Sequence, residues 1–150
     1  MQKINFKDYA FRFKNTDNRI SVFDEIRRKF IILTPEEWVR QHVIRYLLEE
    51  KKYPKSYINV EKIIKINGLT KRYDVVVFQV DGSIFLLVEC KAPAITISQN
   101  TFDQIARYNM VHQVSLLAVS NGLQHYYCHI DLDKRQYQFI ADLPDYVRAV

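Results

Sequence analysis

The sequence predicts a single domain of the α/β (α+β) class, and three features of its 150 residues carry that prediction. Two short runs rich in β-branched and aromatic residues, 71–78 and 84–91, flank Asp81-Gly82, a pair typical of a hairpin turn. They predict two adjacent antiparallel strands. A strong helix start lies upstream at 34–37, and a second helical pattern over 101–112 follows the strands.

The chain before the first helix, residues 1–33, is expected to form an irregular or hairpin-like lead-in packed on the core. The helix itself begins with Thr34 as the N-cap and Pro35 at the first helical position, and Glu37 completes a capping box. We expect this helix to end near Glu50. Its predicted apolar face consists of Val39, Val43, Tyr46 and Leu47.

Further strands are predicted around the second helix. A strand over 58–66 turns at Asn67-Gly68 into the 71–78 strand. Asn100 or Thr101 is the expected N-cap of the second helix. The remaining expected elements are a buried strand at 114–119, a terminal hairpin formed by 124–131 and 136–140, and a short helix or ordered tail at 144–150.

The composition is that of an ordinary globular protein, with 48% hydrophobic and 26% charged residues. No apolar run is long enough to span a membrane, and the N-terminus lacks the apolar core of a signal peptide. We therefore expect a cytoplasmic protein without a membrane partner. Cys90 and Cys128 lack CxxC spacing and are expected to be buried thiols, not zinc ligands.

The net charge of +5 is unevenly distributed along the chain. Residues 1–75 hold 17 Lys/Arg and 10 Asp/Glu, whereas residues 76–150 hold 5 and 7. A basic half beside a nearly neutral half favours a polyanionic partner such as nucleic acid, although a basic surface also serves solubility alone.

Three charged residues interrupt the apolar strand pair at 71–91. Asp74 lies near the start of the first strand, and Glu89 and Lys91 share one face at the end of the second, while Cys90 points to the other face. Charged groups at the end of a buried strand are costly unless they are used. Two carboxylates and a lysine suit a Mg²⁺ or Mn²⁺ site; the alternative is a structural ion pair between Asp74 and Lys91.

Two other polar pairs lie on helical faces. Glu36 projects within the apolar face of the first helix and Arg40 onto its edge, which indicates either a functional pair or a first turn outside the core. Glu37 projects to the side, where its role is capping. Gln104 and Tyr108 stand four residues apart on one side of the second helix, a spacing that is by itself typical of a surface.

Residues with acidic, basic or amide side chains lie in four segments that follow one another along the chain. The segments are LTPEEWVRQ at 33–41, KRYDVVVF at 71–78, VECKAP at 88–93 and QIARYN at 104–109. This pattern resembles the PD-(D/E)XK nuclease superfamily, and more closely the N-terminal nuclease domain of type I restriction enzyme R subunits. The resemblance runs from about residue 20 to residue 125. An isolated Asp…Glu-x-Lys arises often by chance, whereas the flanking Glu-bearing and Gln-x-x-x-Tyr helices make the pattern specific.

The resemblance implies a restriction-endonuclease-like core, in which a central mixed β-sheet is flanked by the two helices. It implies that Mg²⁺, with Mn²⁺ as a substitute, is held by Asp74, Glu89 and the backbone carbonyl of Cys90. Lys91 would orient or help deprotonate the attacking water. The further residues that the resemblance brings to the site are Gln104 and Tyr108 of the extra motif, and Glu36 or Glu37 of the first helix, of which the amphipathic geometry favours Glu36.

The resulting hypothesis is a metal-dependent nuclease for nucleic acid, with DNA as the expected substrate and RNA left open. The basic residues expected to track the phosphate backbone are Arg27, Arg28, Lys29, Arg40 and Arg72. No recognition helix rich in Asn, Arg and Gln is evident, so we expect little sequence specificity unless a homodimer or a partner supplies it.

Two alternatives remain from the sequence. The first is a catalytically silent nucleic-acid-binding or assembly module of a restriction or phage-defence system. The second is an effector nuclease that a partner triggers. The sequence contains no GxxxxGK[ST] phosphate-binding loop, so these residues are not expected to translocate DNA.

Overall fold

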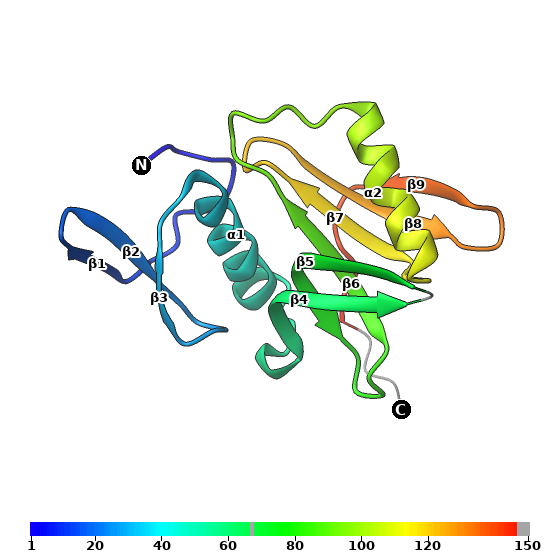
Figure 1. Ribbon diagram of the computed structural model, residues 1–150, viewed down its shortest axis with the longest axis horizontal. Helices are drawn as coiled ribbons and strands as arrows, with labels where there is room; N and C mark the ends of the chain where they lie inside the picture. Colours follow the sequence, from blue (N-terminus) through cyan, green and yellow to red (C-terminus); the bar gives the residue numbers. More distant parts are fainter. Residues whose placement is uncertain (67, 147–150) are drawn as a thin grey trace.

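The computed structural model describes residues 1–66 and 68–146 and shows an α+β fold with one small and one large sheet (Figure 1). The small sheet consists of β1 (Phe13–Thr16), β2 (Arg19–Asp24) and β3 (Lys29–Ile32). The large sheet consists of β4 (Ile58–Ile66), β5 (Leu69–Phe78), β6 (Ile84–Cys90), β7 (Leu116–Ser120), β8 (His125–Asp131) and β9 (Gln136–Ile140). The helical elements are α1 (Pro35–Arg45), a π-helical turn (Tyr46–Glu50), a 3₁₀ turn (Lys55–Tyr57) and α2 (Gln99–Val111).

The large sheet is mixed, with its six strands in sequence order from β4 to β9. Its neighbours pair antiparallel except β6 and β7, which run parallel with Leu87 opposite Leu117. A parallel pair needs a crossover connection, and α2 lies in the chain between these two strands. The antiparallel pairing of β5 with β6, expected from the Asp81-Gly82 turn, is confirmed.

The two helices cover opposite faces of the large sheet. Leu116 and Ala118 of β7 belong to the core cluster that contains α1, whereas Leu117 and Val119 belong to the cluster that contains α2. Because successive side chains along a strand point to opposite faces, this alternation assigns one helix to each face. Figure 1 shows α1 on the side of the small sheet and α2 over β7 and β8.

The first helix begins as its sequence predicts and continues to Glu50 through the π-helical turn. The backbone N–H of Glu37 donates to Oγ1 of Thr34 at 3.1 Å, and Pro35 stands at the first helical position. The capping box is only half formed, because the Glu37 carboxylate turns inward. That carboxylate accepts from Arg27, Arg40 and Gln41 instead of returning to the cap.

The lead-in is more regular than its sequence predicts, since it forms the three antiparallel strands of the small sheet. This sheet is anchored against α1 by β2, whose Val22 and Asp24 are fully buried. The Asp24 carboxylate accepts the backbone N–H groups of Ile26 and Arg27 at 2.8 and 2.7 Å and the Gln41 amide at 2.8 Å. A buried carboxylate thus closes the turn after β2 and ties it to the helix.

Three local predictions need correction or fall outside the structure. Helix α2 begins at Gln99, because the Ser98 side chain accepts the backbone N–H of Thr101; neither Asn100 nor Thr101 is the cap. Asn67 of the expected Asn67-Gly68 turn lies outside the described residues, as does 147–150 of the expected tail. Within the described part of the chain, no helix is long and apolar enough to cross a membrane.

Candidate functional site

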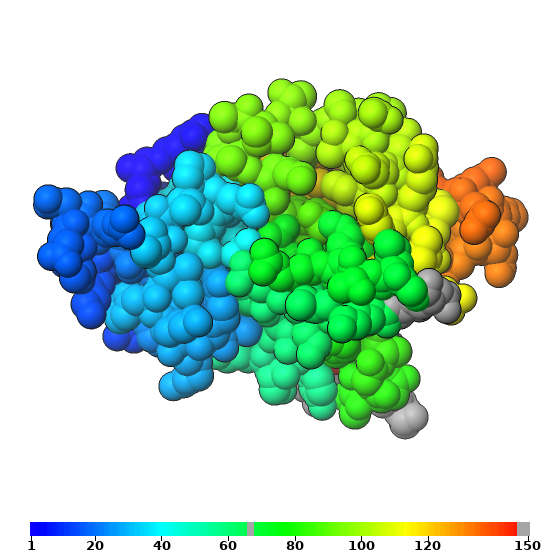
Figure 2. Space-filling model, viewed as in Figure 1, coloured from blue at the N-terminus to red at the C-terminus, as the bar shows by residue number. Residues whose placement is uncertain are grey.

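A charged pocket of about 230 Å³ lies where the N-terminal part of α1 meets β4, the middle of β5 and the C-terminal end of β6. Its lining residues are Glu36, Arg40, Glu61, Arg72, Tyr73, Asp74, Glu89, Cys90 and Lys91. We call it the acidic pocket, because four carboxylates line it. Figure 2 shows the face on which the surfaces of α1, the β4–β5 hairpin and the segment after β6 meet.

Asp74 is oriented by two hydrogen bonds from different elements. The β5–β6 ladder ends with Val75 opposite Val88, and beyond it the backbone N–H of Cys90 donates to Oδ2 of Asp74 at 2.7 Å. The guanidinium of Arg40 donates to Oδ1 at 2.7 Å. The Asp74 carboxylate therefore takes the place of a ladder carbonyl where the two strands separate, and it faces α1.

Glu89 has only 8% of its side chain exposed, and its Oε1 accepts from Nζ of Lys71 at 2.8 Å. Burial and the neighbouring Asp74 charge raise the pKa of Glu89, and the ammonium groups of Lys71 and Lys91 oppose that rise. The Lys71 ammonium also lies 4.9 Å from the ring centroid of Tyr73 and 5.2 Å from that of Tyr108. Lys71 is not among the site residues that the sequence predicts.

Arg40 joins the carboxylates on the α1 side of the pocket, with 8% of its side chain exposed. Besides Asp74 it contacts Glu37 at 2.8 Å, Glu36 at 3.4 Å and Glu61 at 3.6 Å. Burial alone would lower the pKa of Arg40, but the charges of Glu37 and Asp74 outweigh burial and raise it. A permanent cation at the centre of four carboxylates allows them to remain close together.

The two glutamates of the first turn of α1 separate into different roles. Glu36 lines the acidic pocket with 48% of its side chain exposed, and burial together with the charge of Asp74 raises its pKa. Glu37 is buried and occupied by Arg27, Arg40 and Gln41. The expectation that Glu37 projects to the side as a cap is therefore wrong, whereas Glu36 does face Asp74 and its neighbours.

Lys91 extends beyond β6 and lines the acidic pocket, while its backbone N–H donates to the carbonyl of Ser120 at 2.8 Å. Lys91 lines this pocket together with Glu36 and Glu89, and its positive charge opposes the burial-driven rise in the pKa of both carboxyl groups. Within residues 1–66 and 68–146 the Lys91 side chain forms no ion pair. The alternative of an Asp74–Lys91 ion pair is therefore wrong, since Arg40 is the partner of Asp74.

Gln104 and Tyr108 lie beside the acidic pocket and not within its lining. They line a neighbouring depression of about 330 Å³ together with Leu69, Arg107 and Val111. The link to the acidic pocket is Lys71, which contacts Glu89 on one side and the Tyr108 ring on the other. Gln104 itself is exposed on the surface of α2.

Some of the basic residues expected to contact phosphate are exposed to solvent, whereas others are paired with carboxylates. Arg27 has 15% of its side chain exposed and pairs with Asp24, Glu37 and Glu61. The expectation that Arg27 is free to contact phosphate is therefore wrong. Arg28 and Lys29 are exposed at the turn between β2 and β3. Arg72 is exposed as well, and it lines the acidic pocket.

Glu61 lines the acidic pocket and is also absent from the site residues that the sequence predicts. It lies in β4 with φ at +57°, a left-handed conformation that is uncommon for glutamate, and it contacts both Arg27 and Arg40. The β4–β5 ladder pairs Val60 with Val75 and Lys62 with Tyr73, so the irregularity at Glu61 lies beside Asp74. Nothing in the apolar alternation of β4 marks this position.

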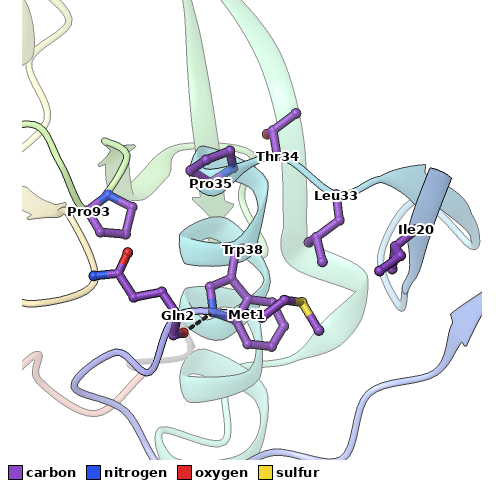
Figure 3. A pocket seen from close by; sticks show the side chains of 8 residues that line it. All are labelled: Met1, Gln2, Ile20, Leu33, Thr34, Pro35, Trp38 and Pro93. Carbon is purple, nitrogen blue, oxygen red and sulfur yellow. Dashed lines mark hydrogen bonds between the residues drawn. The ribbon is translucent and has the colours of Figure 1, made fainter. Parts of the chain in front are cut away.

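A more apolar pocket of about 270 Å³ lies at the N-terminal end of α1 (Figure 3). Its lining residues are Met1, Gln2, Ile20, Leu33, Thr34, Pro35, Trp38 and Pro93. The Trp38 indole N–H donates to the backbone carbonyl of Gln2 at 2.8 Å, as Figure 3 shows. These side chains are apolar or neutral, so we place the candidate chemistry in the acidic pocket.

The donors of the acidic pocket suit a hard divalent cation that keeps part of its water shell. Asp74 and Glu89 supply carboxylate oxygens, and burial raises the pKa of the Cys90 thiol, so Cys90 would contribute its backbone carbonyl. The described residues contain no cluster of three or more His, Cys, Asp or Glu able to hold a metal. Mg²⁺ needs only one or two carboxylates alongside water and phosphate oxygens, so the donor set fits Mg²⁺ and does not fit a closed zinc site.

The chain matches one protein family and is similar in fold to a solved structure. The family described as "Type I restriction enzyme R protein N terminus (HSDR_N)" matches residues 35–144. No curated protein matches. Among solved structures, the fragment structure of a putative HsdR subunit of a type I restriction enzyme from Vibrio vulnificus YJ016 has 18% sequence identity and a TM-score of 0.52.

That alignment covers 75% of this chain and 24% of the Vibrio chain, so this chain spans about a quarter of the structure it resembles. At this identity the likeness concerns the fold alone. The family match covers residues 35–144, which include α1, the whole large sheet and the acidic pocket. This chain belongs to the family of type I restriction enzyme R protein N-terminal domains.

Proposed function

We propose that this domain is a Mg²⁺-dependent nuclease that hydrolyses phosphodiester bonds of DNA with little sequence specificity of its own. The observation that carries the proposal is the convergence of Asp74, Glu89, Lys91 and Glu36 on one pocket where β5 and β6 separate. The restriction context of the family supports DNA as the substrate. The mixed sheet between two helices is compatible with a restriction-endonuclease-like core, which we propose as its finer classification.

The residues of the acidic pocket divide the chemistry between them. Mg²⁺ held by Asp74, Glu89 and the Cys90 carbonyl, with Mn²⁺ as a substitute, would supply a Lewis acid for the phosphate and activate a water. Lys91, which is free of ion pairs in the described structure, orients the attacking water and stabilises negative charge that develops on the phosphate. Glu36, half exposed at the mouth of the pocket, accepts a hydrogen bond from that water.

DNA binding on this proposal uses the exposed basic residues. Arg28, Lys29 and Arg72 contact backbone phosphates, while Gln104 and Tyr108 support the backbone beside the pocket. Arg27 and Arg40 serve this surface indirectly, because their guanidinium groups hold the acidic residues in place. A second copy of the domain or a partner protein would supply any sequence specificity.

A catalytically silent binding or assembly module is the second candidate function. One observation favours it: Asp74 and Glu89 are each paired with a basic side chain, Arg40 and Lys71. Such pairs satisfy buried carboxylates without a metal and would suit a domain that keeps the fold and lacks turnover.

Incubation of the purified protein with supercoiled and single-stranded DNA, in Mg²⁺, Mn²⁺ or a chelator, tests the proposal. We expect cleavage with either metal and none with the chelator. Glu89→Gln, which keeps the shape of the side chain and removes its charge, should abolish cleavage. Retained DNA binding without cleavage under any metal would support the silent module instead.

A further inference from the structure

We propose that Lys71 is a positioning residue that couples metal binding to DNA binding in the acidic pocket. Its ammonium holds Glu89 while the metal is absent and transfers to a backbone phosphate when a divalent cation takes over Glu89. This inference rests on the proposed metal-dependent function, and it assigns a role to a residue outside the Asp74, Glu89 and Lys91 set.

The contact between Lys71 and Glu89 differs from an ordinary surface ion pair. Nζ of Lys71 lies 2.8 Å from Oε1 of Glu89, and the two side chains are 22% and 8% exposed. A carboxylate this far from water needs a counter-charge, because an isolated buried charge is strongly unfavourable. Lys71 is the basic side chain that forms an ion pair with Glu89 in the described structure.

A divalent cation and the Lys71 ammonium cannot both occupy Oε1 of Glu89 without repulsion between their positive charges. A metal that binds Oε1 would therefore displace the ammonium. The aromatic rings of Tyr73 and Tyr108, 4.9 and 5.2 Å from Nζ, provide favourable surfaces beside which the displaced ammonium can remain. A phosphate of bound nucleic acid then replaces the carboxylate as its anionic partner.

Arg40 is not expected to transfer in the same way. It is held by Glu36, Glu37 and Glu61 as well as by Asp74, so losing Asp74 to a metal leaves it with three acidic partners. Lys71 has one acidic partner in the described structure, and losing Glu89 leaves its charge unpaired. The flexible lysine stem also permits a move that the fixed guanidinium fork does not.

Coupling of this kind is reciprocal, so metal should strengthen DNA binding by the same factor by which DNA strengthens metal binding. Lys71→Met removes the ammonium while keeping an apolar stem of similar length. Without DNA, calorimetric titration of this variant with Mn²⁺ should show affinity about tenfold tighter than wild type, because the competing cation is gone. Lys71→Arg should shift affinity in the opposite direction, since a guanidinium pairs with Glu89 more strongly and is harder to displace.

DNA binding provides the second readout, on a hydrolysis-resistant phosphorothioate duplex. With Mn²⁺ present, Lys71→Met should bind this duplex less tightly than wild type, with a log–log salt slope smaller by about 0.9 because one phosphate contact is lost. In chelator the two proteins should bind it equally. Lys62→Met is the matched control, because Lys62 is exposed on the neighbouring strand and forms no ion pair within the described residues. Neither measurement should change in this control.

Four outcomes decide the inference. Tighter metal binding together with a metal-dependent loss of DNA affinity supports it. Unchanged or weaker Mn²⁺ binding by Lys71→Met, in a variant that retains the wild-type circular dichroism spectrum, overturns it while the nuclease proposal stands. A loss of DNA affinity that is equal with and without Mn²⁺ also overturns it, because Lys71 would then contact phosphate permanently. A wild-type protein that binds no Mn²⁺ removes the proposed function and this inference together.

Discussion

Arg40 of α1 donates a hydrogen bond of 2.7 Å to Oδ1 of Asp74 on β5, and this contact joins the first helix to the strand that carries the candidate metal ligand. Both side chains are largely buried, so the pair is shielded from solvent more than a surface ion pair is. The same guanidinium contacts Glu37 and Glu36, so one cation organises the acidic groups of two elements. The geometry of the acidic pocket and the stability of the fold therefore depend on the same residue.

Arg40→Met is predicted to lower the free energy of unfolding by about 3–5 kcal/mol, because it leaves the largely buried Asp74 without its cation and removes one of the two cations paired with Glu37. Urea unfolding at pH 7 measures the effect. Arg107→Met is the matched control: Arg107 is exposed on α2 without an ion pair in the described structure, and its loss should cost no more than about 0.5 kcal/mol. Equal stabilities of the two variants would contradict a structural role for Arg40.

Asp74→Ala is predicted to abolish binding of Mn²⁺ in a calorimetric titration, because it removes one of the two carboxylates proposed to hold the metal. Asp133→Ala, an exposed change in the turn between β8 and β9, should leave the titration unchanged. Metal binding that survives in Asp74→Ala would place the ion outside the acidic pocket.

Much of the fold could be predicted because local patterns specify it. The pattern over 58–66 predicts β4 with the bounds that the structure shows, and the β-branched and aromatic runs of β5 and β6 predict the hairpin around Asp81-Gly82. Thr34 and Pro35 identified the start of α1, since capping uses groups only three residues apart. These features depend on near neighbours in the chain and therefore appear in the sequence.

The partners of the charged residues could not be predicted in the same way. Arg27 pairs with Glu37 and Glu61, which lie 10 and 34 positions away, and Lys71 meets Glu89 across the β5–β6 pair. Charge counts treated Arg27 as available to phosphate, because composition does not record which cations are already neutralised. The resemblance to known nucleases suggested which residues could do chemistry, whereas the structure shows which neighbours hold them.

Asp24 makes the free energy of unfolding depend on pH. Burial would raise the pKa of Asp24, but the backbone N–H of Arg27, the Gln41 amide and the Arg27 guanidinium outweigh burial and hold its pKa below the usual value. The unfolded chain therefore takes up a proton at higher pH than the folded protein does. The stability contributed by Asp24 is present above the ordinary aspartate pKa and is lost as pH falls through the lower folded value.

Asp24→Asn tests this linkage. At pH 7 the variant should be less stable than wild type by about 3 kcal/mol, since it weakens a buried, charge-assisted network. Between pH 5 and pH 3 the difference should narrow, because the variant has no proton to take up at this position. Urea unfolding across that range measures the gap, and a constant gap would remove Asp24 from the acid response.

Substitution of Arg72 should affect DNA binding, whereas substitution of Arg27 should affect stability. Arg72→Ala should weaken DNA binding and reduce the log–log salt slope by about 0.9, because Arg72 is exposed at the acidic pocket and can reach a phosphate. Arg27→Ala should chiefly lower the melting temperature, since its guanidinium is occupied by three carboxylates. Fluorescence anisotropy with labelled duplex and thermal unfolding separate the two effects.

Lys91 provides the sharpest distinction between a nuclease and a silent module. It lines the acidic pocket with Glu36 and Glu89, and its ammonium forms no ion pair in the part of the chain that the structure describes, so the ammonium is available to a phosphate and an attacking water. Lys91→Ala should lower turnover by roughly 10²–10³-fold while DNA binding stays nearly intact, the scale expected when one preorganised charge is removed. Lys91→Arg should be almost as damaging, because a planar guanidinium does not replace a compact ammonium beside a metal.

The same variants separate catalysis from stability, because Asp74 is already paired with Arg40 and does not need Lys91. Lys91→Ala should therefore melt close to the wild-type temperature, and it should bind Mn²⁺ as well as or slightly better than wild type, since the two carboxylates lose a neighbouring positive charge. Cleavage, melting temperature and Mn²⁺ titration are measured on one preparation. Suppose instead that Lys91→Ala melts far below wild type and that wild type cleaves no DNA. Lys91 would then be a structural residue, and the pocket would be a binding site without turnover.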